Sequence, residues 1–174
     1  MTPLSLLAAL ALVAGCSSSA PQTNGPLVAG TDRGQICVPA AAGVVSVGEP
    51  LRLNGSDPAR IDSISLVSPH DMTLIDADLV PITGNNGIGT AVGYPPPPEQ
   101  LASVGIGWTS RVGVDGAIVA SVPTWDLVVG IALAGQASTG KADSISVKYT
   151  VRDKQYEVFT SDALVVQRSS PCAA

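Results

Sequence analysis

The sequence contains little charge, few aromatic side chains and a single histidine. Only 13% of its 174 residues are charged, and the formal net charge is −5. Such an acidic, weakly charged chain has neither the basic stripe that binds nucleic acid nor the polybasic patch that binds anionic lipid. Two Trp, three Tyr and one Phe also leave Val, Ile, Leu and Ala to fill most of any core. The composition therefore predicts no nucleic-acid partner and an aliphatic core.

Residue sets of common catalytic sites are also missing. His70 is the only histidine, and no Gly-x-Ser-x-Gly elbow is present. The segment 135–141 fits Gly-x4-Gly-Lys, but Ala142 stands where a phosphate-binding loop needs Ser or Thr, and a strand pattern follows instead of a helix. Ser-x-x-Lys at 138–141 lacks the partner motifs of penicillin-binding enzymes. We therefore predict no catalytic residues, no cofactor, no metal site and no enzymatic activity.

The N-terminus carries an apolar run that ends in a short motif. Residues 4–13 are apolar apart from Ser5, and ten helical residues span about 15 Å, half of a hydrocarbon core. This is the length of the apolar part of a signal peptide. The following Val13-Ala14-Gly15-Cys16 resembles the lipobox of bacterial lipoproteins. The resemblance implies that Cys16 receives a diacylglyceryl group and becomes the first residue after cleavage.

The resemblance sets the expected domain organisation and location. Residues 1–15 are interpreted as the lipoprotein signal peptide, 16–34 as the lipidated Cys16 and a flexible polar tether, and 35–174 as one folded domain. The chain is then expected at the cell membrane, anchored through lipid on the extracytoplasmic face. Its length fits a single domain.

Two cysteines are left if Cys16 carries lipid. Cys37 and Cys172 lie near the two ends of the expected domain, and an extracytoplasmic compartment permits disulfides. We predict that they are bridged and that the first and last strands are neighbours. Closing so long a loop stabilises a domain by roughly 5 kcal/mol in the chain-entropy model.

The rest of the chain reads as short strands separated by turns, which its 18 Gly and 14 Pro favour. The clearest alternation runs through 144–151, where Ser144, Ser146, Lys148 and Thr150 alternate with Ile145, Val147, Tyr149 and Val151. A turn at 152–155 and a return over 156–160 complete a hairpin. Further strands are expected at 44–47, 51–53, 61–67, 72–82, 125–133 and 164–166, and within 104–122. The pattern predicts an all-β, antiparallel β-sandwich, loosely immunoglobulin-like.

One long irregular stretch, between 84 and 107, interrupts the strands. Tyr94 is followed by four prolines, which favour polyproline II and do not fit a central strand, and residues 98–102 suit one helical turn. A rigid connector and a binding surface are both consistent with this stretch. The residues predicted for a binding surface, with Tyr94 substantially exposed, are Tyr94, Pro95, Pro96, Pro97, Pro98 and Trp108.

The resulting functional prediction is a non-catalytic binding or interaction domain. Its expected partners are the membrane, through the lipid, and an envelope protein or cell-wall component. Two alternatives stay open. His70 and Met72 offer the imidazole and thioether of extracytoplasmic copper proteins, which would make a metal-handling lipoprotein. His70 with the nearby Asp71, Asp76 and Asp78 would suit an envelope hydrolase with an unrecognised site, and the last two aspartates alone would suit Ca²⁺.

Overall fold

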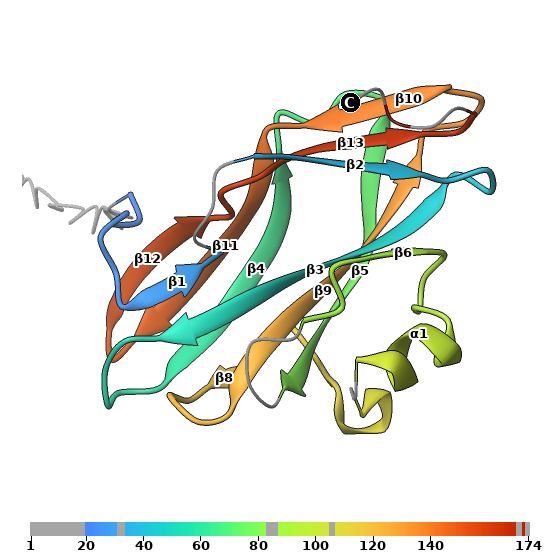
Figure 1. The fold of residues 1–174 in the computed structure, drawn as a ribbon. Helices are drawn as coiled ribbons and strands as arrows, with labels where there is room; N and C mark the ends of the chain where they lie inside the picture. The colour runs from blue at the N-terminus through green and yellow to red at the C-terminus, as the bar shows by residue number, and fades with distance from the viewer. Residues whose placement is uncertain (1–19, 31–33, 83–86, 105–106, 170–171, 173–174) are drawn as a thin grey trace, which may run out of the picture.

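The computed structural model describes residues 20–30, 34–82, 87–104, 107–169 and 172, which fold mainly into β-strands (Figure 1). Residues 1–15, predicted to be a signal peptide, and Cys16 lie outside the described residues. The expected all-β, antiparallel sandwich is confirmed by three sheets. The central sheet contains β1 (Leu27–Ala29), β3 (Val44–Leu53), β9 (Thr124–Leu133), β5 (Met72–Ile82) and β7 (Val112–Gly113), in that order, with β6 (Thr90–Val92) also paired to β3.

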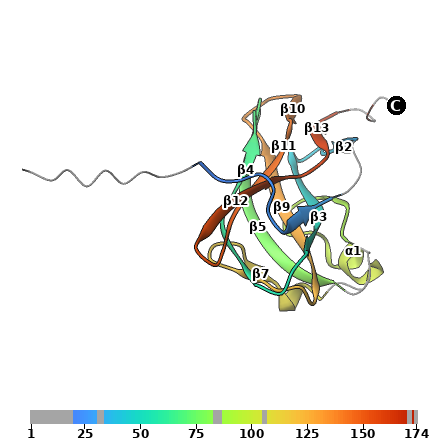
Figure 2. The same cartoon turned by 90° about the vertical axis from the view of Figure 1, so that its left-hand side faces the viewer.

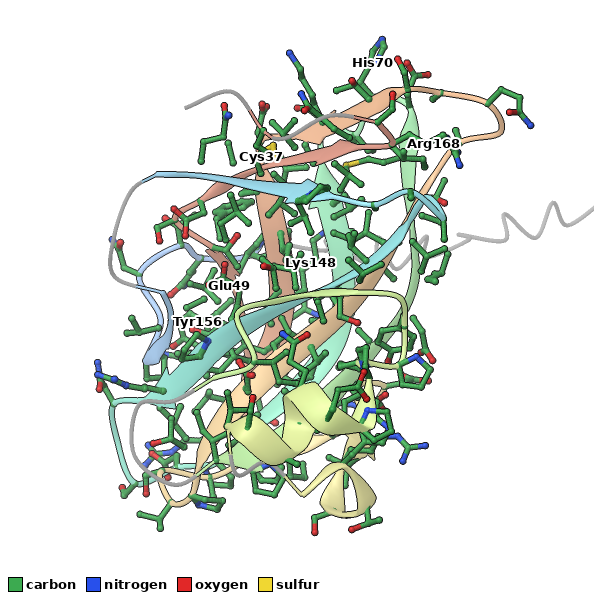
Figure 3. All side chains as sticks on the ribbon, turned by 45° about the vertical axis from the view of Figure 1, so that its right-hand side comes forward. Cys37, Glu49, His70, Lys148, Tyr156 and Arg168 are labelled. Carbon is green, nitrogen blue, oxygen red and sulfur yellow. A yellow bond between two sulfur atoms is a disulfide. The ribbon has the colours of Figure 1, made fainter. Side chains whose placement is uncertain are left out.

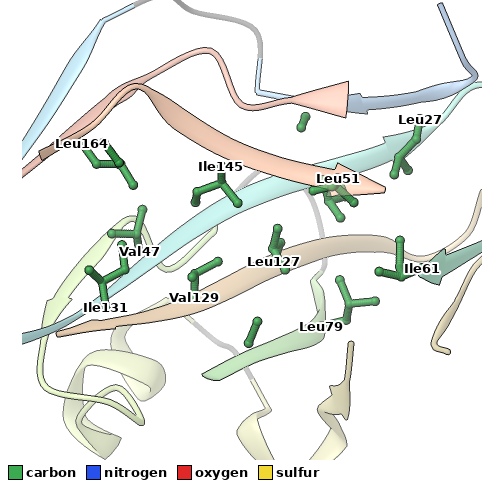
Figure 4. Packing of buried hydrophobic residues seen from close by; sticks show 14 of the residues in the cluster. Leu27, Val47, Leu51, Ile61, Leu79, Leu127, Val129, Ile131, Ile145 and Leu164 are labelled. Carbon is green, nitrogen blue, oxygen red and sulfur yellow. The ribbon is translucent and has the colours of Figure 1, made fainter. Parts of the chain in front are cut away.

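The second sheet faces the central one and encloses the core with it. It is ordered β12 (Lys154–Phe159), β11 (Ser144–Val151), β4 (Ala59–Val67) and β8 (Ile118–Val119). Apolar side chains from both sheets point toward one another in Figure 4. The apolar face predicted for 144–151 is confirmed, because Ile145, Val147 and Tyr149 are fully buried, although Ser144 and Ser146 of the opposite face are buried too. They pack with Val47, Leu51, Leu127, Val129, Ile131 and Leu79 of the central sheet.

A third, small sheet extends the β11–β12 hairpin. Only Asp143 separates β10 (Thr139–Ala142) from β11, and β13 (Ala163–Gln167) follows β12. Beyond the β11–β12 pair, β10 therefore pairs with β13. Beyond β13 lies β2 (Gln35–Pro39), which runs parallel to it. Figure 2 shows these three strands over one end of the sandwich.

The predicted disulfide is present. Cys37 of β2 is bonded to Cys172, with their Cα atoms 5.8 Å apart and a sequence separation of 135. The pairing of β2 with β13 also confirms that the strand carrying Cys37 lies beside the last strand. Chain segments near the two ends of the domain are thus joined by both a ladder and a covalent bond.

The boundary predicted for the tether is wrong within the described residues. Gln22 forms a bridge with Tyr156, and β1 pairs with the edge of β3. Leu27 is only 2% exposed, and its N–H donates to the Tyr149 hydroxyl at 3.1 Å. The three residues of β1 are too few to show the alternation that identifies a strand in a sequence, yet they cover an edge of the core.

Two strand predictions also need correction. The segments expected at 44–47 and 51–53 are one strand, β3, which continues through Pro50. The Pro50 carbonyl accepts a hydrogen bond from Gly30 N at 3.2 Å, so the proline keeps its acceptor role in the ladder. The strand pattern expected to follow the segment 135–141 begins inside it, because β10 starts at Thr139. There Gly140 is packed so closely that a Cβ would lie 2.8 Å from Leu133.

Removing the disulfide should destabilise the domain strongly. Cys37→Ser with Cys172→Ser frees a loop of more than a hundred residues in the unfolded chain, and we expect a loss of roughly 3–5 kcal/mol in unfolding free energy. Urea unfolding of both proteins measures this loss. In the wild type, mass analysis after alkylation without reductant should find no reaction at Cys37 or Cys172. Labelling of both cysteines in native protein would contradict the bridge.

Candidate functional site

The outer face of the central sheet is covered by the segment expected to be irregular. Within the described residues 88–104 and 107–111 this segment includes α1 (Pro98–Ser103), which confirms the expected helical turn, and a 3₁₀ turn at Trp108–Ser110. Leu101 and Ile88 pack against Val80, Ile82 and Val128 of the sheet, in a cluster separate from the sandwich core. The long segment is therefore a packed layer on the sheet.

Tyr94 is half-buried in this layer, so the prediction that it is substantially exposed is wrong. Its hydroxyl donates to Asp78 Oδ2 at 2.6 Å. Its ring lies over Gly130, where a Cβ would come within 2.7 Å of the Tyr94 ring. Tyr94 packs on the sheet for two reasons. The buried Asp78 carboxylate needs a hydrogen-bond donor, and Gly130 leaves room for the ring. The four prolines lie outside the sheets, as expected, and Pro96 is buried.

Trp108 and Arg111 complete what we call the aromatic cluster, made of Asp78, Tyr94, Trp108 and Arg111. The Trp108 ring meets Tyr94 edge-on, with centroids 6.1 Å apart, and the Arg111 guanidinium lies 5.1 Å from the Trp108 centroid. Arg111 Nε also lies 3.5 Å from Asp78 Oδ2. Burial, with the hydrogen bond and charge of Asp78, raises the pKa of the Tyr94 hydroxyl, so it remains a protonated donor.

Exposed apolar side chains occur next to this cluster in space or in the chain. Ile75 is 48% exposed and stands beside Tyr94 over Gly130, while Val92 and Val112 are 51% and 41% exposed. Half-buried rings bordered by exposed aliphatic groups give an amphipathic surface of the kind that contacts partners. The sequence placed Tyr94 and Trp108 in this region but missed Arg111, whose only signal was its position after Trp108.

Of the residues considered for metal binding or hydrolysis, the structure brings together only His70 and Asp71. The His70 imidazole is exposed at one end of the domain, with Nδ1 3.1 Å from Asp71 Oδ2 (Figure 3). Met72 is only 3% exposed, because its side chain lies in the core. Asp76 is exposed, whereas Asp78 is buried and bonded to Tyr94. Neither the copper pair nor the calcium pair of aspartates therefore forms a shared site.

Two buried carboxylates, unnoticed in the sequence, lie within the β3–β9 ladder. Asp126 is 0% exposed, and its Oδ2 accepts from Ile88 N at 2.7 Å, while Oδ1 has no partner. Glu49 is 3% exposed, and its buried Oε1 has no hydrogen-bond partner. Its signal in the sequence was its spacing of two residues from both Val47 and Leu51, which places all three on one face of a strand. The division of β3 into two predicted strands obscured this signal.

Both carboxyl groups are held in an environment that disfavours charge. Burial, then the negative charges of Asp162 and Asp126, raise the pKa of Glu49 to about 7. Burial raises the pKa of Asp126 as well, and the hydrogen bond from Ile88 partly opposes this. Glu49 therefore exchanges its proton near neutral pH.

Comparisons with known proteins give no functional assignment. No protein-family model and no curated protein match the chain. Among solved structures, it is similar to the ASH/PapD-like domain of human CEP192 (PapD-like domain 7), with 8% identity and a TM-score of 0.41 over 98% of this chain and 100% of that one. A similarity this low carries no argument about function. Within the described residues, no helix is long and apolar enough to cross a membrane.

Glu49 should make stability depend on pH. Between its ordinary pKa of 4.5 and its folded value of about 7, the folded protein keeps a proton that the unfolded chain loses. The unfolding free energy should therefore fall as pH rises through this window, by at most ~1.4 kcal/mol per pH unit. Glu49→Gln should reduce this slope and be more stable than the wild type above the window. Urea unfolding with chelator at several pH values measures it, and Glu99→Gln, on an exposed residue, is the control. Equal slopes in the wild type and Glu49→Gln would contradict the assignment.

Tyr94→Phe should weaken the covering layer. The change removes the hydroxyl that donates to the buried Asp78 and leaves that carboxylate with Arg111 alone among its described partners. We expect a loss of about 1–3 kcal/mol in unfolding free energy. Tyr156→Phe, which changes a half-buried ring whose hydroxyl has no such bond among the described residues, is the matched control. If both variants lose the same stability, the Tyr94–Asp78 bond is not responsible.

Proposed function

We propose that the chain is a lipid-anchored domain of the bacterial envelope that binds a partner without catalysing a reaction. The observation that carries the anchoring is the apolar segment 4–13 ending in Ala14-Gly15-Cys16. The lipobox resemblance makes Cys16 the acylated residue and the cell membrane the location. In an extracytoplasmic compartment the bond between Cys37 and Cys172 would also be stable.

The position of the first described residues indicates which side of the domain would face the membrane. Ala20 and Pro21 lie beside Lys148 and Tyr156 of the sheet that contains β11 and β12. Three residues separate Cys16 from Ala20, and an extended chain of this length spans roughly 14 Å. A lipid on Cys16 would therefore hold this side of the domain close to the membrane surface.

The aromatic cluster lies on the other side of the sandwich. In Figures 1 and 2 the described chain begins, in blue, on one side of the domain, and α1 lies on the opposite side. An anchored domain would thus present Tyr94 and Trp108 away from the membrane. Rings already fixed by Asp78, Gly130 and Arg111 would lose little entropy on contact with a partner. We propose an envelope protein or a cell-wall component as that partner.

Cys16→Ala should abolish anchoring. We expect the variant to move from the membrane to the soluble fraction, or to accumulate uncleaved, because no thiol is available for acylation. Fractionation and intact mass of the N-terminal peptide measure both effects. Ser17→Ala, which keeps the motif, is the matched control and should remain at the membrane. Membrane association of Cys16→Ala like that of the wild type, with no acyl group on the wild-type peptide, would refute the proposal.

A further inference from the structure

A small acidic pocket lies around Glu49, at the edge of the core. It has a volume of about 250 Å³ and lies between the end of β1, the middle of β3 and the connection from β12 to β13. Figure 3 shows Glu49 inside the domain, away from the exposed His70. The described residues that line the pocket are Gly30, Ile36, Gly48, Glu49, Pro50, Ser161 and Asp162.

Polar atoms in this pocket are buried without partners. Glu49 is 3% exposed, and neither its Oε1 nor the Ser161 Oγ has a hydrogen-bond partner. Leaving a buried polar atom unpaired costs roughly 1–3 kcal/mol, and more for a charged group. Two such atoms at one pocket indicate that something absent from the described residues satisfies them.

Gly30 shows that Ser161 Oγ and the other carboxylate oxygen of Glu49, Oε2, lie close to a common point. A Cβ placed at Gly30 would lie 2.8 Å from Ser161 Oγ and 3.2 Å from Glu49 Oε2. The backbone of Gly30, with φ of 60°, also has the left-handed conformation that favours glycine. Oxygens from two segments far apart in the sequence therefore converge where no side chain intrudes.

The charge of the pocket defines what can fill it. Glu49 and Asp162 are both carboxylates, and no Lys, Arg or His is among the described residues that line the pocket. Burial, and after it the negative charge of Asp162, raises the pKa of Glu49. A cation would reverse this repulsion and would accept the unpaired oxygen lone pairs at the same time. A neutral hydrogen-bond donor would pair the oxygens but leave the repulsion between the carboxylates, and an anion would increase that repulsion.

We propose that this pocket binds a divalent metal cation of the calcium type, with Glu49, Asp162 and the Ser161 hydroxyl oxygen as ligands. Oxygen-only donors without His or Cys exclude a preference for zinc or copper. Calcium tolerates irregular arrangements of carboxylate, hydroxyl and carbonyl oxygens, whereas magnesium requires a near-ideal octahedron. The proposal concerns this pocket alone and does not depend on lipid anchoring.

Calorimetric titration of the full chain with CaCl₂ tests the proposal directly. At about pH 7.5, where Glu49 is largely ionised, we expect one ion per chain with a Kd of roughly 10⁻⁴–10⁻³ M, weaker binding of Mg²⁺, and a higher Tm with calcium. Lowering the pH below about 7 should weaken calcium binding, because the ion must displace the Glu49 proton.

Glu49→Gln should weaken calcium binding at least tenfold, and Asp162→Asn should act in the same direction. Glu49→Gln removes a buried charge without changing shape and is expected to fold, so it decides the question even if Asp162→Asn does not fold. Glu99→Gln on exposed α1 is the control and should bind like the wild type. No binding heat and no change in Tm up to about 10 mM calcium, well above the expected range, would overturn the proposal. So would unchanged affinity of Glu49→Gln.

Discussion

The central sheet is buried on both faces, and most other features of the domain follow from this constraint. One face of β9 packs into the sandwich core through Leu127, Val129 and Ile131, and the other face packs under α1 through Val128. A two-stranded or one-sided sheet would leave such an apolar strand in water. The layer formed by the described residues 88–104 and 107–111 is therefore required for the stability of β3, β9 and β5.

Burial on both faces also explains where polar and small residues occur in these strands. Gly48 and Gly87 stand so close to Asp126 that a Cβ at either would come within 3 Å of its carboxylate. A Cβ at Gly130 would likewise come within 3 Å of the Tyr94 ring. Each glycine admits a group that pins the covering layer to the sheet. Asp126 holds Ile88 N, and Asp78 holds the Tyr94 hydroxyl. The layer is therefore positioned by buried acceptors as well as by apolar contact.

The sequence predicted the features whose signals are local and strong. The alternation at 144–151 gave β11 and its buried face, and cysteine counting gave the disulfide. It failed where long-range packing decides the outcome. Leu27–Ala29 is too short to show a period, Pro50 concealed the continuity of β3, and the burial of Tyr94 depends on Gly130 and Asp78 in other strands. Glu49 would be expected at the surface because it is charged, and only the packing of the strands shows that it is buried.

The pairing of β2 with β13 means that an early strand can be completed only by residues 163–167. Among the described strands, β13 is the only hydrogen-bonded neighbour of β2, and the two are separated by most of the sequence. Contacts of such high sequence separation form late and slowly. During synthesis from the N-terminus, β2 therefore waits without a partner until residues 163–167 have been made. A chain that lacked residues 163–167 would leave β2 as an unpaired edge, open to association with other copies. Solubility of the protein therefore requires β13.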